Sequence, residues 1–357
     1  MDVGMMMLFS SYGWDDIRDD QVWKEELRLA ELAADSGFDV LWSAEHHFFD
    51  YSFCPDNVQL MSYLAAKCPD IDLGTAAVIL PWHDPLRVAE QVSVLDILCN
   101  GRLRFGMGRG LARREFAAFR GTMDESRERF DEAGPLIVEA LRTGVMEGTG
   151  KHYKQPRIDI RPRSPHDIDG RIYAVASSED SVESAARLGA RMVMFSDRPW
   201  HLRMDAIGRN RELFQEFHGR PAPPLMITDF CVCGPSQDEA EQQARQFMGK
   251  FVESNFHHYE LLGEHFASVK GYDAYAQKAE IAKKSGLDGA TAGFMEAVSW
   301  GTPDNVLRKL EERRKTVGEF ELNVAFRFGG VPFDVAERGL KLFAKEVLPE
   351  IKTWGAA

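Results

Sequence analysis

Short apolar runs alternate with amphipathic segments along almost the whole chain. The apolar runs end at glycine, proline or polar residues, as buried strands do. The segments between them carry apolar residues at helical spacing. In the first of these, Trp23, Leu27 and Ala30 share one face, and Gly37 stands where that helix should end. The pattern predicts eight strands, each followed by a helix: residues 3–9, 38–43, 71–80, 102–108, 172–177, 191–195, 225–233 and 321–326.

Eight strand–helix pairs in 357 residues are the number found in a (β/α)8 (TIM) barrel, which we therefore predict as the fold, in the α/β class. An open, doubly wound sheet shows the same alternation and is the alternative, because alternation alone does not reveal whether the sheet closes. We expect a single domain that spans residues 1–357.

Two segments interrupt the alternation. Residues 144–171 contain three prolines and are predicted to form a loop. Residues 257–300 mix glycine, lysine and tyrosine without a clear period, and a connection of this length usually serves a binding site. We expect this segment to be an insertion after the seventh strand–helix pair, and a lid that becomes ordered when ligands bind. A helical insertion packed on the barrel surface is the alternative.

Composition and charge narrow the function classes. Asp and Glu number 56 against 43 Lys and Arg, so the chain has a formal net charge of −13 and repels nucleic-acid backbones and anionic lipid. No apolar run approaches the roughly 18 residues that a membrane span needs. The five cysteines show no paired metal-ligand spacing. We expect a cytoplasmic protein that binds neither nucleic acid nor membranes.

The first candidate for chemistry is the run Glu45-His46-His47, which follows the second predicted strand. In a TIM barrel the carboxyl ends of the strands face the active site. Neighbouring strand residues point to opposite sides, so one histidine can face the pocket as an acid, a base or a hydrogen-bond donor. The histidines could instead only bond barrel carbonyls. They could also bind a metal, but no further ligand is evident at a suitable spacing, and we expect none.

The second candidate is the glycine-rich run from Gly106 to Leu111, directly after the fourth strand. Its spacing is not that of a dinucleotide-binding loop, and no acidic residue ends a following strand at the required distance. The glycines would instead let a flat ligand approach the backbone, and Arg109 could bind a phosphate through its planar guanidinium. A tight loop with a solvated arginine is the alternative.

Two further strand ends carry small or hydroxylated residues. Ser177, Ser178 and Ser181 lie where a strand runs into a helix, and a helix N-terminus offers N–H groups and hydroxyls to an anion. Capping of the helix by these serines, without a ligand, is the alternative. Ala76 and Ala77 end the third strand and would leave room for a flat ring, although ordinary packing also suits small residues.

Together these segments resemble the bacterial luciferase-like flavin-dependent monooxygenases, in particular the pattern of the luciferase α subunit, an alkanal monooxygenase. The resemblance covers nearly the whole chain and is densest between residues 37 and 144. One motif alone is weakly specific, whereas the ordered set is strongly specific. The motifs are GFDVLWSAEHHF, LGTAAVILP, DPLRVAEQ, GRLRFGMGRGL and MDESRERFD.

The resemblance implies residue roles. It implies a TIM barrel that binds reduced FMN at the carboxyl ends of its strands, with His46 as the pocket histidine that supports the oxygenated flavin. It places a non-proline cis peptide bond between Ala76 and Ala77, beneath the flavin ring. The FMN phosphate would be held by Arg109, Ser178 and Ser181, together with backbone groups of Ser177 and Leu111.

The resemblance also implies an activity. A separate flavin reductase would supply reduced FMN, and O2 would serve to oxygenate a small apolar organic substrate, hydrophobic or aromatic, by Baeyer–Villiger-type oxidation or hydroxylation. A homodimer is expected. Gly108 stands where luciferase carries a reactive cysteine, so light emission is not implied. A deazaflavin-dependent dehydrogenase on the same barrel and a non-catalytic flavin-binding protein are the alternatives. The apolar mouth of the pocket is expected from Phe48, Phe49, Trp82, Phe251 and Phe294.

Overall fold

Eight parallel strands in the described part of the chain close into a barrel, because β3 pairs with β5 as well as with β2. The computed structural model describes residues 1–268 and 272–354, and the side chains in these ranges except those at 267, 268 and 273–282. Each strand coincides with one of the eight predicted segments, so the predicted TIM barrel is confirmed. The strands are β1 (Val3–Met7), β2 (Val40–Ser43), β3 (Asp72–Thr75), β5 (Leu103–Gly108), β8 (Ile172–Val175), β9 (Arg191–Phe195), β10 (Leu225–Phe230) and β13 (Phe320–Ala325).

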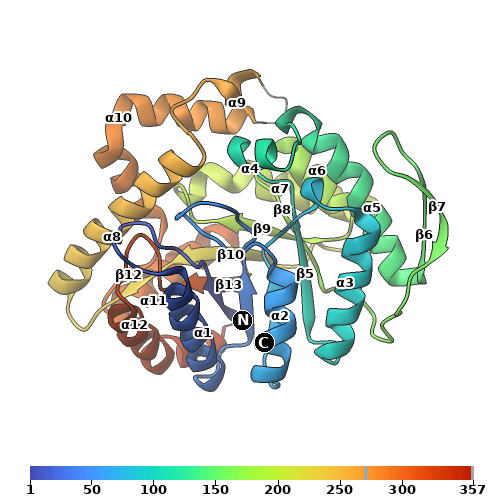
Figure 1. The fold of residues 1–357 in the computed structure, drawn as a ribbon. Coiled ribbons are helices and arrows are strands. Elements are labelled where there is room, and N and C mark those ends of the chain that lie inside the picture. The colour runs from blue at the N-terminus through green and yellow to red at the C-terminus, as the bar shows by residue number, and fades with distance from the viewer. Residues whose placement is uncertain (269–271, 355–357) are drawn as a thin grey trace.

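Helices surround the barrel (Figure 1). They are α1 (Asp19–Asp35), α2 (Asn57–Lys67), α3 (Pro85–Leu98), α4 (Arg113–Ala118), α5 (Ser126–Thr143), α6 (Glu179–Arg187), α7 (Met204–His218), α11 (Pro303–Val317), α12 (Phe333–Glu346) and α13 (Leu348–Lys352). Short 3-10 helices are η1 (Leu80–Trp82), η2 (Met123–Glu125) and η3 (Trp200–Arg203). The short strand β4 (Val78–Ile79) continues the line of β3 and pairs with β5, and β11 (Val232–Cys233) pairs with β12 (Trp300–Gly301). None of the described helices is long and apolar enough to cross a lipid bilayer.

Side chains fill the interior of the barrel. The Trp42 ring is buried and lies edge-on to Tyr173, with 5.0 Å between the ring centroids. Gly4 and Gly74 make room for it, since a Cβ on either residue would overlap the Trp42 ring. Met6 and Met226 complete this cluster, which extends to Leu8, Ala44 and Ala76 at the carboxyl ends of the strands.

An ionic network lies at the amino ends of the strands. The Arg104 guanidinium contacts the carboxylates of Asp2 at 2.7 Å and Asp72 at 2.9 Å. The Tyr173 hydroxyl donates to Glu321 at 3.0 Å, and Arg191 pairs with the same carboxylate at 2.8 Å. These residues and the Trp42 cluster occupy the barrel interior toward the amino ends of the strands, and the cavity described below lies at the carboxyl ends.

Residues 144–171, predicted to be a loop, contain a β-hairpin. Strands β6 (Val145–Thr149) and β7 (Lys154–Asp159) pair antiparallel, and Figure 1 shows them projecting beside α5. The β7 strand is largely exposed, so it lacks the apolar pattern from which a strand is predicted.

The segment between β10 and α11, residues 231–302, includes the predicted insertion and is called the excursion below. It contains α8 (Gln237–His258), α9 (His265–Ser268) and α10 (Asp273–Ala297), and α8 packs along α10 (Figure 1). The excursion begins earlier than residue 257, because α8 belongs to it, and it is largely helical where it is described. The helix α10 consists of two pieces that meet at Gly286, which has a φ of 67°. This break explains why the sequence shows no continuous period; Lys270 and Gly271 lie outside the described residues.

Candidate active site

The residues expected to form the site line one cavity at the carboxyl ends of the strands. The excursion contributes the opposite wall, with Phe256, Tyr259, Leu261 and Phe294 among its lining residues. The predicted site residues on this cavity are His46, Ala76, Ala77, Arg109, Leu111, Ser177, Ser178 and Ser181.

The floor of the cavity is made of small residues. The peptide bond between Ala76 and Ala77 is cis, as the resemblance implied, and both side chains are buried. The side-chain amide of Asn57 donates to the carbonyls of Ala77 at 3.1 Å and Ser43 at 3.2 Å. The start of α2 therefore ties the end of β2 to the residues that follow β3.

Glu45 joins the same two strand ends through its carboxylate. One oxygen contacts His47 Nε2 at 3.1 Å and His83 Nε2 at 2.7 Å, and the other accepts the backbone N–H of Ile79 at 2.9 Å. Burial alone would raise the pKa of Glu45, but the hydrogen bonds from His47 and His83 lower it below its ordinary value. Burial opposes the charge on His83 too, yet the Glu45 carboxylate raises the pKa of that imidazole. Glu45 is thus an ionised cross-link in the lining of the cavity.

The two adjacent histidines face different surroundings, as expected for neighbouring residues. His46 lines the cavity, whereas the buried ring of His47 packs against Trp82 and Phe119, with centroids 5.3 and 4.7 Å away. Of the five aromatic residues expected at an apolar mouth, Phe251 and Phe294 line the cavity. The other three, Phe48, Phe49 and Trp82, lie outside the cavity lining.

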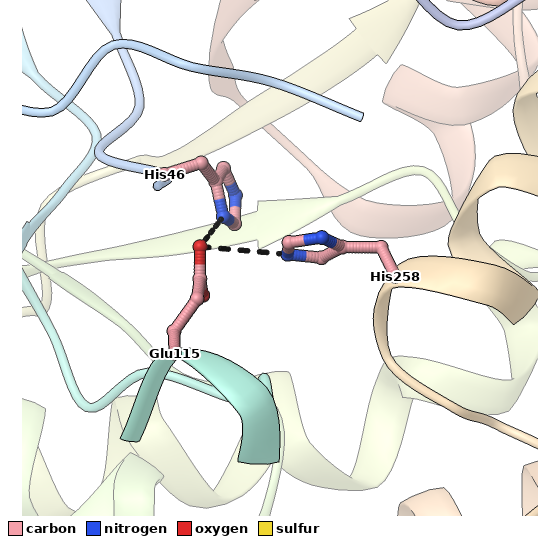
Figure 2. A group of neighbouring side chains, drawn as sticks. All are labelled: His46, Glu115 and His258. Carbon is pink, nitrogen blue, oxygen red and sulfur yellow. Dashed lines mark hydrogen bonds and ion pairs between the residues drawn. The ribbon is translucent and has the colours of Figure 1, made fainter. Parts of the chain in front are cut away.

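His46 lies beside a buried carboxylate and a second histidine. Figure 2 shows Glu115, on α4, between the imidazoles of His46 and His258. Its Oε1 lies 3.3 Å from His46 Nδ1 and 3.6 Å from His258 Nε2, and it accepts the backbone N–H of His47 at 2.8 Å. The other ring nitrogen of His46, Nε2, lies 3.4 Å from the Tyr259 hydroxyl.

Charge and burial determine the state of this cluster. Burial would raise the pKa of Glu115, but the neighbouring imidazoles of His46 and His258 bring it well below its ordinary value. Burial lowers the pKa of His258, against the opposing effect of Glu115. An ionised Glu115 therefore faces a neutral His258. The three donor atoms lie within 4.8 Å of one another, so the cluster could also bind a divalent cation.

A cationic region lies on the side of the cavity formed by β5, α5 and α6. Arg109 and Arg127 both line it, and burial together with the charge of Arg109 lowers the pKa of Arg127. The Nη1 atom of Arg127 contacts Asp131 at 3.3 Å and Ser184 at 3.1 Å. Its Nε and Nη2 atoms are buried and have no hydrogen-bond partner among the described residues. A partly buried guanidinium with two unpartnered nitrogen atoms, close to a second arginine, suits an anion.

The serines cap helix α6 beside these arginines. The Ser181 hydroxyl accepts the backbone N–H groups of Ser177 at 3.0 Å and Ser178 at 2.9 Å, and it donates to the Ser178 carbonyl at 2.7 Å. The capping alternative therefore describes these serines as the structure has them. Ser177, Ser178 and Ser181 all line the cavity, so an anion bound there could replace the hydroxyl as the acceptor of these N–H groups.

Tyr272, from the excursion, covers the cationic region. The Arg109 guanidinium lies over its ring, 3.9 Å from the centroid. The Tyr272 hydroxyl donates to the Gly110 carbonyl at 3.0 Å and lies 3.0 Å from the Ser126 hydroxyl. The excursion is therefore connected to the glycine-rich loop and to the start of α5.

Aromatic rings form the apolar wall of the cavity. Phe230 lies 4.4 Å from Phe251 and 5.5 Å from Phe294, measured between ring centroids, and all three line the cavity. They come from β10, α8 and α10, away from the strands that carry the arginines. The cavity thus combines an anion-binding side, a floor of small residues and an aromatic side.

Sequence reasoning did not identify three residues of this site. Arg127 lies in the quoted motif MDESRERFD, so a second arginine for an anion could have been suspected there. Glu115 lies in LARREFAAF among other charged residues, and His258 belongs to the segment without a clear period. No local pattern indicates that these residues approach His46 and Arg109.

Known proteins share this architecture. A family model described as luciferase-like monooxygenase matches residues 1–319. The alkanal monooxygenase alpha chain of Photorhabdus laumondii is 25% identical over 340 residues, 93% of this chain and 93% of that protein. The crystal structure of the monooxygenase RslO1 from Streptomyces bottropensis superposes with a TM-score of 0.79 at 26% identity, covering 98% of this chain and 99% of that one.

A further solved structure shares the fold at lower identity. It is the oxygenating constituent of 3,6-diketocamphane monooxygenase from Pseudomonas putida, a type II Baeyer–Villiger monooxygenase in complex with FMN. Its TM-score is 0.71 at 18% identity, over 98% of this chain and 99% of that one. The resemblance carried by the sequence motifs is confirmed by the family model: the chain belongs to the luciferase-like monooxygenases, enzymes of the flavin-dependent monooxygenase class.

Proposed function

We propose that this enzyme is the oxygenase component of a two-component system. It takes reduced FMN from a separate flavin reductase and uses O2 to oxygenate a small apolar organic substrate, by Baeyer–Villiger-type oxidation or by hydroxylation. The observation that carries the proposal is the combination, in one cavity, of two partly buried arginines, a floor of small residues, a histidine and an aromatic wall. The arginines suit the phosphate of FMN and the small residues suit its flat ring. The histidine can transfer a proton, and the aromatic wall suits an apolar substrate.

The residues present fit FMN. Arg127 has two buried nitrogen atoms without acceptors among the described residues, and a phosphate supplies acceptor oxygens and negative charge. Arg109 and Arg127 would bind the phosphate together with Ser178 and Ser181, whose cap would open to accept it. The flavin ring would lie on Ala76 and Ala77.

The protein's part in the reaction is to position, to exclude water and to move a proton. When bound, reduced FMN supplies the electrons that activate O2. His46 would hold or transfer a proton at Nε2, the nitrogen nearer to Tyr259. Phe230, Phe251 and Phe294 would hold an apolar substrate, hydrophobic or aromatic, and keep water away from the reacting atoms.

The excursion would act as the cover of this site. Its aromatic residues form part of the cavity lining, and Tyr272 lies against Arg109, one of the arginines that would bind phosphate. Binding of FMN would therefore stabilise the closed arrangement of α8 and α10 over the barrel.

The enzyme would form a homodimer through α2 and α3. Large apolar side chains are exposed on the outer faces of these two helices, and such clusters mark protein interfaces. They are Tyr63 at 47%, Val94 at 39%, Ile97 at 40% and Leu98 at 56% exposure.

Oxygen uptake tests the function directly. Photoreduced FMN would be mixed with the enzyme in air-saturated buffer, with a panel of ketones, aldehydes and aromatic compounds. We expect oxygen consumption and, for some panel members, a product that has gained one oxygen atom. Hydride transfer to a substrate without oxygen uptake would instead indicate a dehydrogenase.

The phosphate assignment predicts a contrast between two ligands. Replacing either Arg109 or Arg127 by alanine removes a charge-assisted contact worth roughly 1.5–3 kcal/mol. Binding of reduced FMN should therefore weaken by about one to two decades, and riboflavin binding should change little. Arg129→Ala is the matched control, since this arginine of α5 pairs with Glu125 instead. Equal losses for FMN and riboflavin would place the phosphate elsewhere.

If His46 has this role, its replacement should uncouple oxygen consumption from formation of the oxygenated product. In His46→Ala, FMN affinity should stay nearly intact while oxygenation falls about 10²-fold or more, the range for a positioned acid–base group. Hydrogen peroxide should account for most of the oxygen consumed. His47→Ala should instead reduce the yield of folded protein, because its ring is packed away from the cavity and bonded to Glu45. Full coupling in His46→Ala would contradict the assignment.

The cover predicts protection from proteolysis. Lys283 and Lys284 are exposed on α10, and trypsin should cut after them more slowly once reduced FMN is bound. Cleavage after Lys151, which is exposed between β6 and β7, is the internal control and should not change. Equal rates at α10 with and without FMN would show that the excursion does not respond to the cofactor.

If the dimer forms through α2 and α3, a charged residue on this surface should separate the subunits. Leu98→Glu places a charge at the proposed interface, on the most exposed of these side chains, and should shift the mass in analytical ultracentrifugation from dimer to monomer. Leu202→Glu is the control, because this side chain is 62% exposed and lies away from α2 and α3. A wild-type monomer would overturn the proposal.

A further inference from the structure

The contacts of Glu115 determine which nitrogen of His46 carries a proton. An ionised carboxylate can only accept hydrogen bonds. Its Oε1 is held in place by the backbone N–H of His47 at 2.8 Å and lies 3.3 Å from His46 Nδ1. A neutral imidazole has one N–H, so this contact requires the proton on Nδ1. The lone pair of Nε2 then faces the cavity.

We propose that Glu115 is a positioning residue, which fixes His46 as the Nδ1–H tautomer and thereby presents Nε2 to the cavity as a base. The proposal rests on the role given to His46 above, and it specifies the form in which His46 begins the reaction. Glu115 itself does not line the cavity, so it acts through the imidazole.

The surroundings of Glu115 suit this task. The side chain is 0% exposed, and α4 carries it at the end of the glycine-rich loop. The His258 ring lies on its other side and stacks on Tyr51, with 4.5 Å between centroids. Tyr51 also meets the His46 ring edge-on at 5.0 Å, so His46 is held at a fixed orientation by packing as well as by its bond to Glu115.

A divalent cation in the same cluster would require the opposite proton position. A metal ion takes the lone pair of the nitrogen that it binds, and Nδ1 of His46 is the atom that faces Glu115 and His258. The remaining proton of a metal-bound His46 would then sit on Nε2. The metal-free and the metal-bound cluster therefore differ in which ring nitrogen of His46 carries the proton.

Nitrogen NMR of the histidine rings distinguishes them. In ¹⁵N-histidine-labelled enzyme without flavin, the His46 signals, identified by their loss in His46→Ala, should show a protonated Nδ1 and an unprotonated Nε2. In Glu115→Leu, the proton should move largely to Nε2, since nothing then holds it on Nδ1. Glu26→Gln, which changes a buried carboxyl group elsewhere, is the control and should leave the His46 signals unchanged.

Two further variants separate positioning from simple support of the fold. Glu115→Gln keeps an acceptor oxygen for His47 and His46 but removes the charge. It should retain the Nδ1–H tautomer, bind FMN normally and lose at least about tenfold in kcat, because protonated His46 has no counter-charge. His258→Phe keeps the stacked ring and removes its nitrogens, and it should leave the His46 tautomer unchanged.

The outcomes distinguish this proposal from the proposed function. A wild-type enzyme that consumes O2 but carries the His46 proton on Nε2 would overturn the role of Glu115 alone, and this result needs no variant. Stoichiometric Co²⁺ binding that is lost in His258→Phe, together with inactivation by chelators, would overturn it in favour of a metal site. The expected tautomer in an enzyme without oxygen uptake would overturn the proposed function and leave the geometry of Glu115 intact.

Discussion

Two buried carboxylates, those of Glu45 and Glu115, determine how the residues of the site are arranged. An ionised carboxylate is stable inside a protein only where N–H donors surround it, so each must gather such donors from several parts of the chain. Glu45 draws together the end of β2 and the residues after β4. Glu115 draws α4 toward residues 46 and 47 and faces α8. His46 lies between these two connections, and its position follows from both.

The barrel determines where this arrangement can be built. Trp42 fits in the interior because Gly4 and Gly74 lack side chains, and ion pairs occupy the amino ends of the strands. The remaining space is therefore at the carboxyl ends, where the arginines of one side and the aromatic rings of the other meet over small residues. The polarity of the cavity thus follows from which strands carry its lining: β5 and α5 the cations, β10 and the excursion the apolar rings.

The sequence was sufficient to predict the barrel and much of the cavity. Strands and helices differ in their period, and residues at the ends of parallel strands must converge, so His46, Ala77, Arg109 and Ser178 could be placed together in advance. Contacts between distant segments have no such signal. Glu115 and His258 are separated by 143 positions in number and meet only because α4 and α8 fold over the same strand ends. The break at Gly286 likewise hid the helix α10, since neither of its pieces continues the period of the other.

The methionines of the barrel add a chemical consequence. Met6 and Met226 are each 1% exposed and pack in the cluster that reaches Ala44 and Ala76 on the cavity floor. A thioether is readily converted to a sulfoxide, which is polar and carries an additional oxygen atom, and this change disrupts apolar packing. Peroxide produced at this floor would meet sulfur atoms in the next layer of side chains, where no repair enzyme can reach them. Each turnover that releases peroxide instead of product would thus risk oxidising these buried methionines. The working lifetime of a molecule would then depend on the fraction of consumed oxygen that reaches the product.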